Sequence, residues 1–206
     1  MKKIIIGFDG LVRAGKSSTV KRLADVFDAT IVDEYKGYAT RAGLVFPSYP
    51  PKSYKKAIEA SKFFINLEKQ RYFDLCNYKL TDKKIFLTDR TCHSCIAFDY
   101  AANHYTKLGT FKEVEHLWQN TKKVVPDLNF FMDVSQTNLK KRMRLNGDVF
   151  PPHFSNKRFN GYMTKFFMQQ CKKNKNMIRI NANQTREKID EDIKKVIKKY
   201  LIKLSK

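Results

Sequence analysis

The residues with the clearest chemistry form a glycine-bounded loop close to the start of the sequence. The loop reads Gly10-Leu11-Val12-Arg13-Ala14-Gly15-Lys16-Ser17, follows the apolar run Ile4-Ile5-Ile6 and precedes a helical pattern. A strand, this spacing and a helix are typical of a phosphate-binding loop, whose backbone N–H groups surround an anion. Lys16 would contact the outer phosphates, and the hydroxyl of Ser17 would bind Mg²⁺. We therefore predict a polyphosphate site formed by Gly10, Arg13, Ala14, Gly15, Lys16, Ser17 and Ser18.

Charged residues follow two further predicted strands. Asp33-Glu34 comes after the strand predicted over 29–32, and Asp89-Arg90 comes after the strand predicted over 84–88. Ligands of α/β sheets bind at the carboxyl ends of strands, so these side chains are candidates for the same site. Asp89 would reach the Mg²⁺ shell, and Arg90 would clamp a phosphate; a surface ion pair is the alternative. Glu34 would bind metal, accept a proton or hold a sugar hydroxyl, and its alternative is a solvated turn.

Two helical patterns contribute the remaining candidates. In the pattern over 53–77, Phe63 and Arg71 fall near one apolar stripe that is otherwise expected to be core. An arginine among aromatic residues near a cleft would meet a base or a phosphate, so we predict that both residues bind substrate. A second helix is predicted to begin at the N-cap Ser135 and to end in a basic cluster that includes Arg142. Arg142 either complements the helix dipole or reaches the transferring phosphate.

The elements that must position these residues alternate between strand and helix. Strands are predicted over 4–6, 29–32, 84–88, 126–134 and 177–180. This alternation predicts an α/β fold in which a five-stranded parallel sheet carries helices on both faces. No repeat or linker divides the sequence, so we expect one domain over residues 1–206. The segment at about 142–156 would form a lid, and the proline-rich connection 35–52 is a second candidate binding loop.

Composition narrows the class of protein. The chain has 206 residues, of which 42% are apolar, and a formal net charge of +21. No apolar run approaches about 20 residues and the one after Met1 is too short for a signal peptide, so we expect a cytoplasmic protein without a membrane span. The charge suits a nucleotide or a nucleic acid, and nucleic acid is not favoured because the lysines are spread over nearly every segment. The four cysteines lack the second half of a zinc site and are expected to be idle thiols.

The ordered motifs resemble those of the thymidylate kinases, the P-loop kinases that convert thymidine monophosphate to the diphosphate. The resemblance runs nearly from end to end, through the phosphate loop, Asp89-Arg90 with Ser94 and Ala97-Phe98, Pro126 to Val134, Gly161-Tyr162 and Ile180 to Gln184. It implies a nucleotide kinase fold, ATP as phosphoryl donor, Mg²⁺, a nucleotide substrate and a homodimer.

The resemblance also implies roles for residues on the donor side. Lys16, Ser17 and the loop amides would hold ATP, and Asn183 and Gln184 would lie beside its adenine. Arg13 would stabilise charge on the moving phosphoryl group. Arg142 lies where the family's lid helix begins.

On the acceptor side, the resemblance implies that Arg90 holds the acceptor phosphate, Asp89 acts through Mg²⁺ and Arg71 lies near the base. Two features depart from the family pattern. Val12 stands where an acidic residue usually meets the acceptor sugar, and Asp33-Glu34-Tyr35 replaces an arginine-containing motif. A carboxylate after the second strand resembles the deoxynucleoside kinases, in which a glutamate takes a proton from the 5′-hydroxyl.

Several functions remain open at this point. The leading interpretation is transfer of the γ-phosphoryl group of ATP to a (deoxy)nucleoside monophosphate, dTMP first. The alternatives are a deoxynucleoside kinase with Glu34 as the base, a kinase or NTPase acting on nucleic-acid ends, and a nucleotide-binding regulator without transfer activity.

Overall fold

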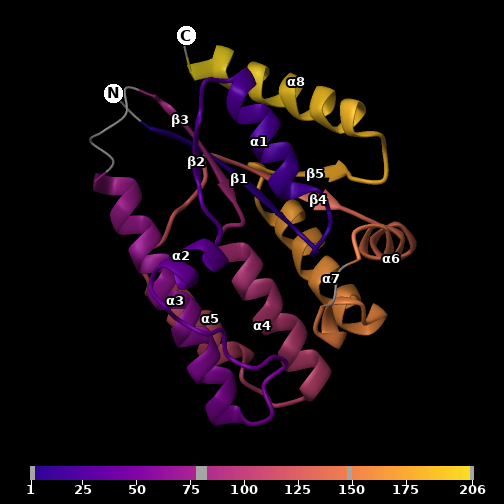
Figure 1. Ribbon diagram of the computed structural model, residues 1–206. Coiled ribbons are helices and arrows are strands. Elements are labelled where there is room, and N and C mark those ends of the chain that lie inside the picture. Colours follow the sequence, from indigo (N-terminus) through magenta and orange to yellow (C-terminus); the bar gives the residue numbers. More distant parts are fainter. Residues whose placement is uncertain (1–2, 78–82, 148–149, 205–206) are drawn as a thin grey trace.

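The computed structural model describes residues 3–77, 83–147 and 150–204. Its centre is a sheet of five parallel strands in the order β2-β3-β1-β4-β5 (Figure 1). The strands are β1 (Ile4–Gly10), β2 (Thr30–Val32), β3 (Ile85–Asp89), β4 (Leu128–Asp133) and β5 (Met177–Asn181). This arrangement confirms the predicted five-stranded parallel sheet, and it brings the carboxyl ends of all five strands to one edge.

Helices cover both faces of the sheet. α1 (Lys16–Val26) and α8 (Arg186–Leu204) lie together on one face, and α4 (Cys92–Thr106) and α7 (Lys157–Lys173) pack against each other on the opposite face (Figure 1). The long helix α3 (Tyr54–Asn77) packs beside α4. The remaining elements are α2 (Tyr35–Arg41), α5 (Phe111–Gln119), α6 (Gln136–Leu145) and a 3₁₀ turn, η1 (Pro152–Phe154).

The sheet is buried because helices lie on both of its faces. Phe8, Phe130 and Phe131 are completely buried, and the ring of Phe131 stacks on that of Phe167 from α7 at a centroid distance of 4.8 Å. Strand interiors in such a sheet read as continuous apolar runs rather than alternating ones, as Ile4-Ile5-Ile6 does. The core therefore fixes the strand ends from which the candidate residues project.

Helix caps define where two of the site-bearing helices begin. The side chain of Ser135 accepts a hydrogen bond from the backbone N–H of Asn138 at 3.3 Å, which confirms the predicted N-cap of α6. Thr91 caps α4 in the same way by accepting a bond from the N–H of His93 at 3.2 Å. Each cap fixes the direction in which its helix leaves the sheet.

Two helices were not predicted from the sequence. α2 lies in the stretch expected to be an irregular connection, because Gly37 and two tyrosines give it poor helix propensity. Packing of the buried Tyr35 and Tyr38 among side chains of α3 stabilises it instead. α5 buries Val114 and Trp118 in the same cluster.

The expected lid-like segment, about 142–156, begins in α6 and continues past η1, and its residues 148–149 lie outside the described part of the chain. Within residues 3–77, 83–147 and 150–204, no helix combines the length and apolar character needed to cross a bilayer.

Candidate active site

The phosphate-binding loop joins β1 to α1 and depends on two glycines in backbone conformations that side chains disfavour. Gly10 has φ +143° and Gly15, the N-cap of α1, has φ +100°. A Cβ atom at Gly10 would lie 2.6 Å from the carbonyl oxygen of Met132, which is closer than any real contact. Both positions therefore need glycine for the chain to turn from β1 into α1.

Lys16 is buried at the floor of this loop. Its Nζ donates a hydrogen bond to the carbonyl of Leu11 at 2.8 Å. Burial lowers the pKa of Lys16 to about 7, the positive charge of Arg90 acts in the same direction, and Asp89 and Glu34 oppose the shift. A phosphate group at the loop would favour the ammonium form, because an adjacent anion stabilises the charged state of a lysine.

Arg142 reaches from α6 across the phosphate-binding loop. Its Nη1 donates to the carbonyls of Arg13 at 3.2 Å and Ala14 at 3.0 Å, and its Nη2 donates to the carbonyl of Ala182 at 2.6 Å. None of the salt bridges among the described residues involves Arg142. Its charge is therefore available to a phosphate, while its carbonyl partners hold it beside the loop.

Asp89 supplies a carboxylate under the loop, at the end of β3. The residue is buried, and its Oδ1 has no hydrogen-bond partner among the described residues. Those residues contain no group of three or more His, Cys, Asp or Glu side chains that would hold a metal on its own. Asp89 and Ser17 offer the oxygen ligands that Mg²⁺ takes, because proteins bind this ion through one or two side chains together with substrate phosphates. When bound, this ion would neutralise charge on the phosphate oxygens.

Glu34 and Arg90 form an ion pair across the ends of β2 and β3. The Nε of Arg90 lies 3.2 Å from Oε2 of Glu34, and its Nη1 donates to the carbonyl of Gly10 at 3.2 Å and to Oγ of Ser94 at 3.3 Å. The second carboxylate oxygen of Glu34, Oε1, accepts no hydrogen bond from any residue that the structure describes. Arg90 therefore connects the phosphate loop to a carboxylate that keeps one oxygen free.

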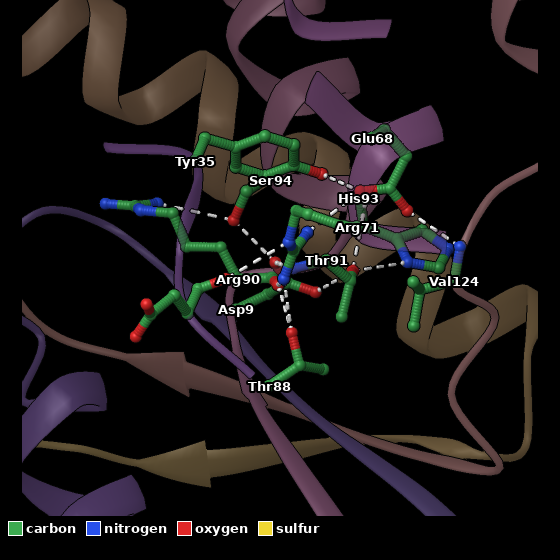
Figure 2. Close-up of polar contacts among 11 residues, drawn as sticks. Asp9, Tyr35, Glu68, Arg71, Thr88, Arg90, Thr91, His93, Ser94 and Val124 are labelled. Atoms are coloured by element: carbon green, nitrogen blue, oxygen red, sulfur yellow. Dashed lines mark hydrogen bonds and ion pairs between the residues drawn. The ribbon is translucent and has the colours of Figure 1, made fainter. Parts of the chain in front are cut away.

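Behind this pair, a buried network holds the start of α4 (Figure 2). The Asp9 carboxylate accepts hydrogen bonds from the backbone N–H of Thr91 at 3.0 Å and from the hydroxyls of Thr91 and Ser94. Burial alone would raise the pKa of Asp9. The electrostatic effect of His93 and these hydrogen bonds outweighs burial, so the pKa lies below its usual value. An ionised Asp9 thus fixes Ser94, which in turn contacts Arg90.

A single cavity of about 1370 Å³ contains both the phosphate loop and the Glu34–Arg90 pair. Its far end is lined by aromatic side chains from five different segments of the chain. These are Tyr35, Phe46, Tyr49, Phe64, Phe98 and Phe154. The cavity therefore has a phosphate end with Lys16 and Arg142, and an aromatic end suited to the flat face of a base.

Comparison with known proteins identifies the family. The family described as thymidylate kinase matches residues 8–193, which is most of the chain. The chain belongs to the thymidylate kinase family. As a member of that family it is a phosphotransferase of the nucleotide kinase class, and the family's phosphoryl donor is ATP. A sequence search against curated proteins gave no match.

Solved structures share the fold of this family member. Deoxyadenosine kinase from M. mycoides is 13% identical with a TM-score of 0.69, over 95% of this chain and 100% of that one. Thymidylate kinase from Ehrlichia chaffeensis is 18% identical with a TM-score of 0.65, over 96% of this chain and 99% of that one. Both confirm the nucleotide kinase type of P-loop fold.

The structure gathers most of the predicted site residues around this cavity. Those that line it are Arg13, Ala14, Gly15, Lys16, Ser17, Ser18, Glu34, Arg90 and Arg142. Gly10, at the start of the loop, and Asp89 are buried and do not line the cavity.

Four further predicted residues, beyond Gly10 and Asp89, are not in the lining of the cavity. Arg71 is completely buried and all of its contacts are internal, because its guanidinium is held by Glu68 and by backbone carbonyls. Phe63 packs edge-on against Phe46 at 5.8 Å, whereas its neighbour Phe64 faces the cavity.

Asn183 and Gln184, the other two, shape the turn between β5 and α8. Oδ1 of Asn183 accepts from the N–H of Ser135 at 2.9 Å, and Nε2 of Gln184 donates to the carbonyl of Asn181 at 3.1 Å. Arg186, two residues further on, lines the cavity instead.

Several lining residues were missed by sequence reasoning. Phe64, Tyr49 and His153 line the cavity, yet they come from a helix, a loop and a 3₁₀ turn without a common motif. A sequence signal existed for Tyr49 alone, because it lies in the connection 35–52 that was predicted to be a binding loop, and no single residue of that loop was identified.

Proposed function

We propose that this kinase transfers the γ-phosphoryl group of ATP to the 5′-hydroxyl of a deoxynucleoside. The observation that supports this acceptor is the contact of Glu34 with Arg90 at 3.2 Å, inside the cavity that also contains Lys16. A hydroxyl is a weak nucleophile, and removal of its proton in the transition state accelerates its attack. Glu34 has the free carboxylate oxygen that this role needs, and Arg90 orients it.

In the transfer step, a bond forms between the acceptor 5′-oxygen and the γ-phosphorus, and the bond from that phosphorus to the β–γ bridging oxygen breaks. The hydroxyl proton passes to Glu34, and ADP leaves. Lys16, Arg13 and Arg142 surround the phosphate end of the cavity and would stabilise charge on the transferred group. The aromatic end of the cavity would take the acceptor base, with Phe64 as one wall.

On the side of the cavity that would bind ATP, we include the predicted Mg²⁺ site and the predicted lid in this proposal. Mg²⁺ would be held through Ser17 and Asp89 together with the phosphates of ATP. The segment 142–156 would close over the donor, because it carries Arg142 at one end and lines the cavity at Phe154 and His153 near the other. Residues 1–206 would then work as one domain with a movable lid.

Transfer to dTMP is the second candidate, and the family match favours it. A monophosphate is already an anionic nucleophile, so positioning and charge neutralisation would be enough. In this case Arg90 would hold the acceptor phosphate beside Glu34, and the carboxylate would repel that phosphate. This repulsion favours the nucleoside over the monophosphate in our proposal. The fold is shared both with a deoxyadenosine kinase whose solved structure contains the products dCMP and dCDP and with a thymidylate kinase, so the fold does not separate the two candidates.

The test is a coupled ADP-release assay with ATP and Mg²⁺ across the four deoxynucleosides and their monophosphates. Mass spectrometry of the products separates transfer from hydrolysis of ATP. We expect turnover of at least one deoxynucleoside, with a kcat/KM above that of every monophosphate. Turnover confined to dTMP would contradict the nucleoside proposal and support the second candidate. Turnover of no acceptor would overturn both.

A further inference from the structure

A buried ion pair on α3 lies outside the cavity and has no part in the steps above. Glu68 and Arg71 are one helical turn apart, both side chains are fully buried, and Nη1 of Arg71 lies 2.8 Å from Oε2 of Glu68. A buried pair of this kind costs desolvation energy and is often no more stabilising than apolar residues of the same size. Its hydrogen bonds to the rest of the molecule are therefore the features to explain.

The bonds of Arg71 reach the two chain segments that carry the Glu34–Arg90 pair. Figure 2 shows Arg71 beside Glu68, Thr88 and Arg90. Its Nε donates to the carbonyl of Asp33 at 3.1 Å, next to Glu34, and its Nη2 donates to the carbonyl of Arg90 itself at 2.8 Å. The guanidinium also lies over the ring of Tyr35, 4.4 Å from its centroid. One side chain thus contacts both neighbours of Glu34 and the backbone of its partner.

These contacts are made where the sheet no longer holds the two strands together. The ladder between β2 and β3 ends at the pair Val32 and Thr88. Asp33 and Arg90 lie beyond that pair, so no strand hydrogen bond connects them, and Arg71 spans the gap. Arg90 also has φ +67°, an angle that residues other than glycine seldom adopt and that surrounding contacts must hold.

Glu68 anchors the arginine from the other side. Its Oε2 accepts the hydroxyl hydrogen bond of Tyr35 at 2.9 Å as well as the bond from Arg71, and its Oε1 accepts the N–H of Val124 at 2.7 Å. Both carboxylate oxygens are therefore used, and the position of the guanidinium is fixed relative to α3 and to the segment before β4.

From these contacts we infer that Arg71, anchored by Glu68, is a positioning residue that sets the distance between Glu34 and Arg90 without touching substrate. The inference deepens the proposed function, in which that pair prepares the acceptor. Arg71→Lys keeps the charge but loses the planar fork that reaches two carbonyls at once. Because a displacement of about 1 Å in a reacting group costs about 10²-fold, we expect kcat/KM for the acceptor to fall by about 100-fold. The Kd for ATP should stay within about twofold.

The decisive experiment is a double-mutant cycle with Glu34→Gln, measured on whichever acceptor the protein turns over. If Arg71 acts through Glu34, Arg71→Lys should cost less than about threefold once Glu34 is already glutamine. The same 100-fold loss in both backgrounds, or no loss in either, would overturn the positioning role. The matched control is Arg179→Lys, which replaces the planar guanidinium of another ion-paired arginine. Nη2 of Arg179 lies 2.6 Å from Oδ2 of Asp133, and neither residue lines the cavity. It should leave kcat/KM unchanged.

Two additions keep the test decisive. If Arg71→Lys does not fold, Thr88→Val replaces it, since valine has a similar shape and removes one hydrogen-bond partner of Arg71. We expect a loss of about tenfold and the same coupling to Glu34→Gln. A crystal structure of Arg71→Lys does not depend on enzymatic turnover. It therefore tests the positioning role of Arg71 even if the proposed acceptor is wrong. It should show Glu34 farther than about 4 Å from Nε of Arg90, and an unchanged contact would overturn the inference.

Discussion

The two ends of the cavity are built in different ways. The phosphate end comes mainly from one contiguous segment, Gly10 to Ser18, whose shape is set by two glycines and the start of α1. The aromatic end comes from α2, the connection after it, α3, α4 and η1, which the fold brings together from distant parts of the sequence. A local motif can therefore specify how the donor phosphates are held, whereas recognition of the acceptor depends on tertiary packing.

The sharpest way to break the phosphate end is to remove its buried ammonium group. We expect Lys16→Ala to lower kcat by about 10³-fold, since preorganised charges at a transferring phosphoryl group supply effects of this size. Steady-state ADP release measures the loss. Lys56→Ala removes an exposed lysine that pairs with Glu59 and should leave the rate unchanged. A rate within tenfold of the unaltered protein in Lys16→Ala would show that the loop does not carry the transfer.

Removal of the buried carboxylate at the end of β3 should have the next largest effect. Asp89→Asn is expected to lower kcat by about 10²-fold and to raise the Mg²⁺ concentration that gives half-maximal rate, because its orphaned oxygen is a candidate cation partner. Titration of the rate with Mg²⁺ measures both effects. The control Asp28→Asn changes an exposed aspartate that pairs with Lys83. An unchanged Mg²⁺ requirement in Asp89→Asn would remove Asp89 from the metal site.

At the aromatic end, two adjacent phenylalanines give a matched pair of variants. Phe64 lines the cavity and Phe63 does not, although the sequence predicted Phe63. Phe64→Ala should raise KM for the acceptor by about tenfold, because a base stacked on an aromatic ring gains roughly 1–3 kcal/mol. Phe63→Ala should change that KM by less than about twofold while lowering the melting temperature. The opposite pattern in the initial-rate data would restore the assignment made from the sequence.

The smallest predicted effect concerns pH and the donor. Because the pKa of Lys16 is about 7 in the free protein, its ammonium is lost as pH rises, and ATP binding must restore the proton. The affinity for ATP should fall about fivefold between pH 7 and pH 8, and calorimetry in buffers of different ionisation enthalpy should detect proton uptake on binding. In Lys16→Arg, whose side chain stays charged, the pH dependence should be flatter. An equally steep fall there would assign the titration to another group.

The fold could be predicted largely from the sequence. Apolar runs such as Ile4-Ile5-Ile6 identify buried strands, and Ser135 marks the start of α6. The helices α2 and α5 could not be found in this way. α2 has Gly37 in its interior, and its stability comes from contacts of Tyr35 and Tyr38 with α3, which a local pattern does not contain.

The same difference between local pattern and tertiary packing separates the site residues that could be predicted from those that could not. The phosphate loop, Glu34 and Arg90 were predicted because each follows a strand end, and Arg142 because it lies in the last turn of a predicted helix. Arg71 was predicted to meet the substrate because it lies among aromatic residues, yet its ion pair with Glu68 turns it inward. Whether a long side chain on a helix points to a cavity or to a buried partner depends on the neighbouring elements, and the sequence alone does not show them.

The central claim is that Glu34 removes a proton from a hydroxyl acceptor, and the most direct test is the rate of transfer by Glu34→Gln. Glutamine keeps the shape of the side chain but cannot act as a base. Measured at saturating ATP and deoxynucleoside, kcat should fall by about 10²–10⁴-fold, with the Kd for ATP unchanged. A kcat within a few-fold of the unaltered protein would contradict the account.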